Sequence, residues 1–156
     1  MILRGMERKG CSGHEAGRLL LADMYRQYSG SELPSILVTD RGKPYFADGK
    51  LHFSITHTKK HVFCALSEKP VGIDAEELDR EIDLRLAQKI LSSGELAQWE
   101  AASDQRLALL TFWVLKEAAA KCTGEGLRGY PNRTDFSMDD PRVQKMYTCL
   151  VAVVEE

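Results

Sequence analysis

The chain has 156 residues, of which 44% are hydrophobic and 28% charged, and its formal net charge at pH 7 is -2. This length suits one domain with its own hydrophobic core and is short for two, and the composition is typical of a globular protein. A net charge this close to zero gives no reason to expect a nucleic-acid partner, although it does not exclude a local basic pocket.

The apolar and cysteine patterns indicate a cytoplasmic protein. The longest apolar run, Leu150 to Val154, is far shorter than the roughly 20 residues that a membrane span needs, so we expect no membrane partner and no export. The four cysteines are widely scattered and form no C-x-x-C pair, which favours reduced thiols over a metal finger or a disulfide framework. We expect one domain over residues 1-156.

The first half of the chain predicts one helix and several short strands. Residues 1–13 combine basic residues with glycines and serine, which suits a loop or a loosely held arm. Apolar residues at helical spacing and alternating β-prone runs then predict the following order: helix 14–28, strand 36–39, a turn-rich segment 40–44, strand 51–57, its hairpin partner 61–67, and strand 71–75.

The second half is mainly helical. Helices are expected over 83–91, 94–102 and 106–122, and the last of these is rich in Ala and Leu and stops at Thr123-Gly124. Residues 124–140 have an irregular pattern with proline, and 146–154 predict a closing strand.

Two carboxylates at the end of the strand expected over 71–75 point to a cation site. Residues two apart on a strand face the same side, so Asp74 and Glu76 should project together while Ile73 and Ala75 face the core. Two neighbouring like charges favour a positive group between them, and a hard divalent cation is one candidate. The plain alternative is a strand that runs out into solvent with surface charges, and the short D-x-E pattern alone does not exclude it.

One face of the helix expected over 106–122 carries an aromatic side chain and two charged side chains. Trp113, Glu117 and Lys121 are four residues apart and share one face. An ordinary exposed Glu–Lys pair is the simpler explanation of the two charges, and core packing is the favoured role of Trp113. Cys64 and Cys122 are expected in the core.

The two patterns, taken together, resemble a known family. Gly72-Ile73-Asp74-Ala75-Glu76, followed by Trp113-x-x-Lys116-Glu117-Ala118-x-x-Lys121, resembles the bipartite signature of the 4′-phosphopantetheinyl transferases. The joint match is specific because both patterns must occur in order and at a suitable separation. Glutamate in the third place of D-x-E resembles the type that activates peptide and polyketide synthases, as in the surfactin system.

Further segments are similar to the family in the same order. Residues 41–46 resemble its G-K-P segment, 53–58 its F-N-x-S-H-S strand, and Gly94-Glu95 an acidic helix start. Arg18 resembles a nucleotide-contacting arginine in the first helix. The resemblance covers roughly residues 14–138.

The resemblance implies a mechanism that uses coenzyme A and Mg²⁺. Asp74, Glu76 and Glu117 are the implied Mg²⁺ ligands, and Glu117 is also the implied base, acting directly or through a water. Lys121 is implied to stabilise the phosphate under attack. The implied contacts to coenzyme A come from Arg18, Lys43, Thr56, His57, Asp74, Lys116 and Lys121. Lys116 is equally well explained as a surface lysine, and a strand histidine such as His57 would by itself be read as structural.

The implied fold is α+β, with a small, mostly antiparallel sheet and packed helices in two pseudo-related halves. The implied enzyme activity is transfer of the 4′-phosphopantetheine arm of coenzyme A to a serine of an acyl or peptidyl carrier protein. The alternative is a shortened, inactive relative that binds coenzyme A or a carrier without catalysis, because the chain is short for the family and Val114 replaces Ser, Thr or Cys. A monomer is the first expectation and a dimer the alternative.

Overall fold

The computed structural model describes residues 1–126 and 135–156, so residues 127–134 of the predicted irregular segment lie outside the described part. The elements follow the order β1 (Ile2–Glu7), α1 (Gly13–Ser29), β2 (Ile36–Val38), β3 (Pro44–Phe46), β4 (His52–His57), β5 (His61–Ser67), β6 (Val71–Glu77), η1 (Leu84–Leu86), α2 (Ala87–Ile90), α3 (Ser93–Ala101), α4 (Gln105–Thr123), β7 (Val143–Met146) and β8 (Cys149–Glu155).

Two similar units build the fold. In the first unit, β1, β5 and β4 form a three-stranded antiparallel sheet in that order, and α1 packs on it. Strands β2 and β3 form a separate hairpin. In the second unit, β6, β8 and β7 form a three-stranded antiparallel sheet in that order, and α4 packs on it. In both units the strand before the long helix pairs with the last strand of the following hairpin. The predicted α+β class with antiparallel sheets and two pseudo-related halves is confirmed.

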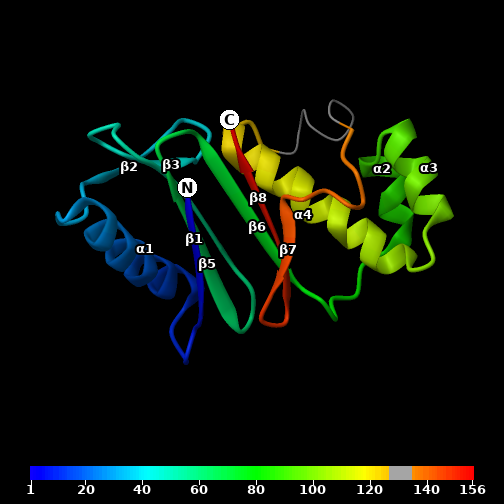
Figure 1. Ribbon diagram of the computed structural model, residues 1–156, viewed down its shortest axis with the longest axis horizontal. Coiled ribbons are helices and arrows are strands. Elements are labelled where there is room, and N and C mark those ends of the chain that lie inside the picture. The colour runs from blue at the N-terminus through cyan, green and yellow to red at the C-terminus, as the bar shows by residue number, and fades with distance from the viewer. Residues whose placement is uncertain (127–134) are drawn as a thin grey trace.

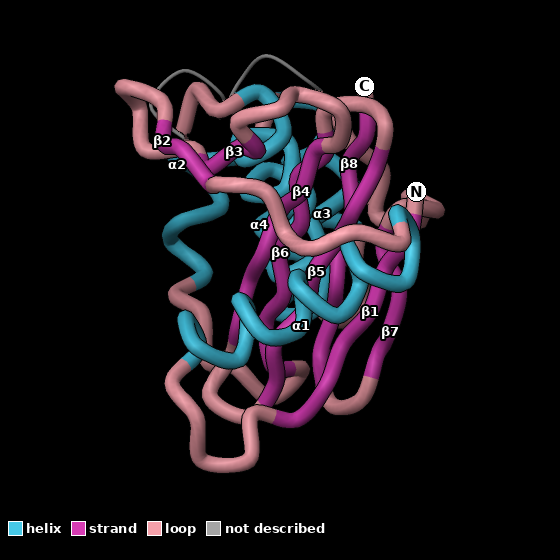
Figure 2. The backbone as a smooth tube through the Cα atoms, turned by 90° about the vertical axis from the view of Figure 1, so that its left-hand side faces the viewer, coloured by secondary structure: helices cyan, strands magenta, loops and turns pink. Residues whose placement is uncertain are grey.

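The two three-stranded sheets lie between the two long helices. Helix α1 packs on β4 and β5, and α4 packs on β6 and β8 (Figure 1). Figure 2 shows α1 in front of the strands and α4 behind them. The units meet where β4 contacts β6, and the backbone N–H of Ile73 donates to Ser54 Oγ there at 3.1 Å. The junction therefore brings side chains of both sheets together.

Strand β5 is buried along its whole length because both of its faces are covered. Val62, Cys64 and Leu66 pack with α1, whereas Phe63 and Ala65 pack against residues of β6 and β8. This explains the continuous apolar run from Val62 to Leu66, which is the pattern of a strand buried on both faces.

The approach of β6 to α4 requires a glycine. A Cβ at Gly72 would lie 2.0 Å from the carbonyl oxygen of Ala118 and 2.3 Å from the backbone nitrogen of Cys122. Because these are backbone atoms of α4, they cannot move aside as the end of a flexible side chain could. Gly72 therefore sets the close packing of β6 against α4.

The N-terminal prediction is wrong. Residues 1–13 were expected as a loop or loosely held arm, but Ile2–Glu7 form β1 and pair with β5 from Ile2–Leu66 to Glu7–His61. The strand has no clear apolar alternation because most of it is only partly buried at the edge of the sheet. Its stability comes from a partner distant in the sequence, which local patterns do not report.

Two predicted elements in the second half of the chain also differ from the expectation. The closing strand predicted over 146–154 is present as β8, which begins later, at Cys149, because Tyr147 turns the chain with a φ of 53°; the preceding strand β7 was not predicted. The helix predicted over 83–91 is a 3₁₀ turn followed by one turn of α-helix, and the Asp83 carboxylate caps the 3₁₀ turn by accepting a hydrogen bond from the backbone N–H of Arg85. The other predicted helices and strands are present with small shifts at their ends.

Within the described ranges, no helix combines the length and apolar character needed to cross a membrane. Cys64 and Cys122 are buried, as predicted, and all four cysteines are free thiols.

Replacing Gly72 with Ala should lower the free energy of unfolding by about 1–3 kcal/mol or more, because the new methyl group overlaps backbone atoms of α4. Urea unfolding measures this change. Gly94→Ala is a matched control in α3, where the nearest described atom to the new methyl group would be in the Asp135 side chain at 3.3 Å. Equal stability of the two variants would contradict the packing role of Gly72.

Candidate active site

The carboxylates of β6 project toward α4. Asp74 is buried and Glu76 is half-buried, and both line an open pocket of about 380 Å³. Ile73 and Ala75 face the core between the two sheets. The predicted alternation of β6 is therefore confirmed, and the alternative of a strand running into solvent is wrong.

Helix α4 supplies the opposite wall of the pocket. Glu117, Lys121 and Trp113 all line it, as their spacing of four residues predicts. Lys121 Nζ lies 2.7 Å from Asp74 Oδ1, so the main ion pair of this lysine is with β6. This face of α4 does not carry a simple exposed Glu–Lys pair.

The first unit contributes Thr56 and His57 from the end of β4. Thr56 is buried, and its hydroxyl donates to Asp74 Oδ1 at 3.3 Å and accepts from Lys121 Nζ at 3.3 Å. His57 is exposed at the pocket rim, and its ring packs so closely on Gly13 that a Cβ there would lie 2.3 Å away. His57 is thus held beside the N-terminus of α1, where backbone N–H groups favour anions.

Arg80 was missed from the sequence. It lies beyond β6, lines the pocket, pairs with Glu76 Oε1, and places its guanidinium 5.7 Å from the Trp113 ring centroid. The sequence held no local signal for this pair, because a spacing of four predicts a contact on a helix and Glu76 lies on a strand. Trp113 is partly buried against the α4 core and also lines the pocket, so its predicted packing role is only part of its environment.

The pocket raises the proton affinity of its acids. Burial raises the pKa of Asp74, and the Lys121 ammonium offsets part of this rise. Burial also raises the pKa of Glu76, while Arg80 opposes the shift. The pKa of Glu117 is raised by burial first and then by the Asp74 carboxylate. Three acids with raised pKa values in one pocket indicate a deficit of positive charge there.

The donor set fits a hard divalent cation. Carboxylate oxygens are the ligands that Mg²⁺ prefers, and Asp74 Oδ2 is buried without a hydrogen-bond partner among the described residues. Asp74 and Glu76 are now paired with Lys121 and Arg80, which a bound cation would partly displace. Among the described residues, Asp74, Glu76 and Glu117 do not form a cluster whose ligand atoms all lie within 4.8 Å of one another. The three carboxylates are therefore farther apart than the ligands of a preassembled metal site.

Three predicted contacts to coenzyme A lie outside the pocket. Arg18 is on the exposed face of α1, and Lys43 reaches across to the carbonyl oxygen of Cys122 near the end of α4. Lys116 is buried and lies 2.8 Å from the buried carboxylate of Glu95. The predictions for Lys116, a phosphate contact or a surface lysine, are therefore both wrong, because a partner on α3 draws its side chain into the core.

Comparison with known proteins gives a family for this arrangement. Residues 70–152, which include β6 and α4, match the model of a family described as the 4′-phosphopantetheinyl transferase superfamily. This span is more than half of the chain. The chain belongs to the 4′-phosphopantetheinyl transferase superfamily. The resemblance recognised in the two sequence patterns is confirmed.

Similar curated proteins carry the name 4′-phosphopantetheinyl transferase. The chain is 38% identical over 88 residues to gsp of Aneurinibacillus migulanus, with 55% of this chain and 36% of that protein covered. It is 32% identical over 123 residues to Sfp of Bacillus subtilis strain 168, with 72% and 54% covered. It is 35% identical over 114 residues to AcpT of Escherichia coli K12, with 70% and 56% covered. The chain thus spans about half the length, or less, of these relatives.

Val114 departs from the family pattern at a position that does not face the pocket. Its side chain is fully buried in the α4 core cluster. The replacement of a hydroxyl or thiol by an apolar group therefore leaves the charged groups of the site unchanged.

Replacing Glu117 with Gln should raise the melting temperature at pH 7 by about 1–4 °C, because the amide removes a partly buried charge near Asp74. Because the pKa of Glu117 is raised in the folded state, its protonated form favours folding. This contribution to the free energy of unfolding is fully present below the unfolded pKa of about 4.3 and is lost as the pH rises through the folded-state pKa. The gain should therefore shrink as the pH falls toward 4.

Differential scanning fluorimetry over pH 4 to 7 measures this difference. Glu100→Gln, at an exposed position of α3, is the matched control and should show little change. A lower melting temperature for Glu117→Gln at pH 7 would show that the electrostatic description of the pocket is incorrect.

Proposed function

We propose that this chain transfers the 4′-phosphopantetheine arm of coenzyme A to a serine of an acyl or peptidyl carrier protein, with adenosine 3′,5′-bisphosphate as the second product. The observation that carries the proposal is the convergence of Asp74, Glu76, Glu117 and Lys121 on one pocket at the junction of the two units. The family membership supports it. The names of the relatives support it as well, although the chain spans only part of their length.

Mg²⁺ is the proposed cofactor, held by Asp74, Glu76 and Glu117. Once bound, it would neutralise charge on the diphosphate of coenzyme A and on the departing bisphosphate. The unpartnered Asp74 Oδ2 and the raised pKa values of all three acids support a cation at this position.

The protein's own groups then position the substrates and move one proton. The serine oxygen forms a bond to the phosphorus that carries the pantetheine arm, and the bond from that phosphorus to the bisphosphate breaks. Glu117 accepts the serine proton, directly or through a water. Lys121 donates to the phosphate oxygens as charge develops on them.

Coenzyme A also carries a 3′-phosphate, which requires a contact beyond the acids and Lys121. His57 at the pocket rim, together with the N-terminus of α1, offers positive potential for one phosphate. Arg18 and Lys43 remain candidates for more distant contacts.

The proposed setting is a monomer in the cytoplasm. One chain supplies both βαββ units that form the pocket, which supports a monomer, and the free thiols suit a reducing compartment. Light scattering of the purified protein distinguishes a monomer from a dimer.

The direct test is intact-mass spectrometry of apo acyl and peptidyl carrier proteins incubated with the chain, coenzyme A and Mg²⁺. The carrier should gain the mass of the phosphopantetheine arm. Glu117→Gln should slow this gain by about 10²–10⁴-fold because the base is lost. The control Glu100→Gln should match the wild type.

The alternative of binding without catalysis predicts a different result. Coenzyme A would bind, yet no carrier in a panel of acyl and peptidyl types would gain mass. That outcome would reject the proposed transfer.

A further inference from the structure

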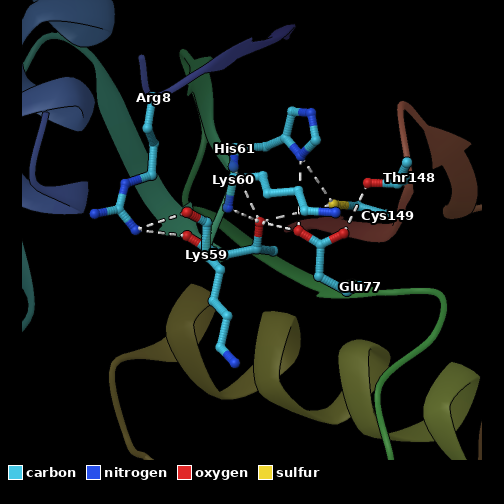
Figure 3. A network of polar contacts seen from close by, with 8 residues as sticks. Arg8, Lys59, Lys60, His61, Glu77, Thr148 and Cys149 are labelled. Carbon is cyan, nitrogen blue, oxygen red and sulfur yellow. Dashed lines mark hydrogen bonds and ion pairs between the residues drawn. The ribbon is translucent and has the colours of Figure 1, made fainter. Parts of the chain in front are cut away.

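A second group of side chains that could hold a metal ion lies away from the pocket. His61 begins β5, Glu77 ends β6 and Cys149 begins β8. One ligand atom from each, an imidazole nitrogen, a carboxylate oxygen and a sulfur, all lie within 4.8 Å of one another. Figure 3 shows the three side chains pointing toward one another from separate strands.

Strand pairing and a ring stack hold this group in place. Glu77 lies opposite Cys149 in the antiparallel register of β6 and β8. The His61 ring stacks on Tyr147 with centroids 4.8 Å apart, and the Tyr147 hydroxyl donates to the carbonyl oxygen of Gly5 at 2.9 Å. The ring of His61 is therefore fixed from the β7–β8 turn.

Two hydroxyl groups orient the carboxylate. Thr58 donates to Glu77 Oε1 at 2.6 Å, and Thr148 donates to Glu77 Oε2 at 2.7 Å. Supporting hydrogen bonds of this kind are typical around metal ligands. These bonds leave further lone pairs on both carboxylate oxygens.

The spacing of the three groups is close to that of ligands around one atom, and a weak nitrogen–sulfur hydrogen bond already joins His61 and Cys149. His61 Nδ1 lies 3.7 Å from Glu77 Oε1, which is too long for a hydrogen bond, and 3.7 Å from Cys149 Sγ. Tetrahedral Zn²⁺ with its usual bond lengths places neighbouring ligand atoms roughly 3.3–3.6 Å apart. A small contraction of the group would reach this geometry.

We propose that His61, Glu77 and Cys149 bind a Zn²⁺ ion, with a solvent molecule as the fourth ligand. A neutral imidazole, a carboxylate and a thiolate together carry two negative charges, which one divalent ion balances. The mixed nitrogen, oxygen and sulfur set suits Zn²⁺, whereas Mg²⁺ prefers oxygen ligands alone. The site is therefore chemically distinct from the Mg²⁺ pocket.

The two groups also lie on opposite faces of β6. Glu77 follows Glu76 by one residue, so their side chains alternate across the strand. Glu77 also lines a cleft of about 570 Å³ together with Thr58 and Lys59, and Glu76 and Arg80 of the acidic pocket border the same cleft.

A reactive thiol is a poorer explanation of Cys149. Its side chain is fully buried, and burial raises the pKa of the thiol to about 11, so it is protonated at neutral pH. A bound Zn²⁺ ion would remove that proton and would join β5 of the first unit to β6 and β8 of the second. Binding to the folded state should therefore stabilise the junction of the two units.

Cobalt spectroscopy tests the site directly. The full chain is treated with a chelator, dialysed and titrated with Co²⁺, and a thiolate-to-cobalt charge-transfer band should appear, saturate at one equivalent and disappear when Zn²⁺ is added. Zn²⁺ affinity is measured by competition with a chromophoric chelator. Thr148→Val, which removes a hydrogen bond to Glu77, should weaken Zn²⁺ binding by about 10-fold.

Matched variants assign the band to these residues. Cys149→Ser and His61→Gln should each weaken Zn²⁺ binding by more than about 100-fold, and Cys149→Ser should abolish the band. Cys122→Ser, at a buried cysteine next to Lys121 in α4, should keep it. Glu117→Gln should also keep it, which separates this site from the proposed Mg²⁺ pocket and makes the result independent of transferase activity.

Three outcomes would overturn the proposal. They are the absence of a charge-transfer band in the wild type, a band that persists in Cys149→Ser, and a band that is lost in Glu117→Gln or Cys122→Ser. The wild-type spectrum alone is decisive if Cys149→Ser does not fold.

Discussion

The site depends on the direct contact between the backbone of β6 at Gly72 and the backbone of α4. A side chain at this position would overlap the carbonyl oxygen of Ala118 and the nitrogen of Cys122. Two residues beyond Gly72, Asp74 can therefore reach Lys121, which directly precedes Cys122 in α4. The acidic pocket is a consequence of a strand and a helix packed without an intervening side chain.

The repeated βαββ arrangement explains why the pocket contains residues of both units. The carboxylates and Lys121 come from the second unit, whereas Thr56 and His57 come from the end of β4 in the first. The contact of β4 with β6 brings these groups together. The same junction, on the other face of β6, gathers His61, Glu77 and Cys149. Both groups of side chains thus use the place where the two sheets meet.

Residues that share one element could be predicted from the sequence. Strand alternation placed Asp74 and Glu76 on one face, and helical spacing placed Glu117 and Lys121 on another. Lys116 was assigned wrongly because its partner, Glu95, lies on a different helix and is fully buried. The strand β1 was missed for a related reason, since its pairing with β5 joins segments far apart in the chain. Local patterns report the face of an element but not the element that covers it.

The most direct measurement of the central claim is the affinity for coenzyme A by isothermal titration calorimetry, with Mg²⁺ present or removed by a chelator. If the carboxylates of the pocket hold a cation that pairs with the diphosphate, Mg²⁺ should strengthen binding by at least about 10-fold, the equivalent of about 1.4 kcal/mol. Equal affinity under both conditions would contradict the account, because buried acids without a cation would repel the anionic ligand.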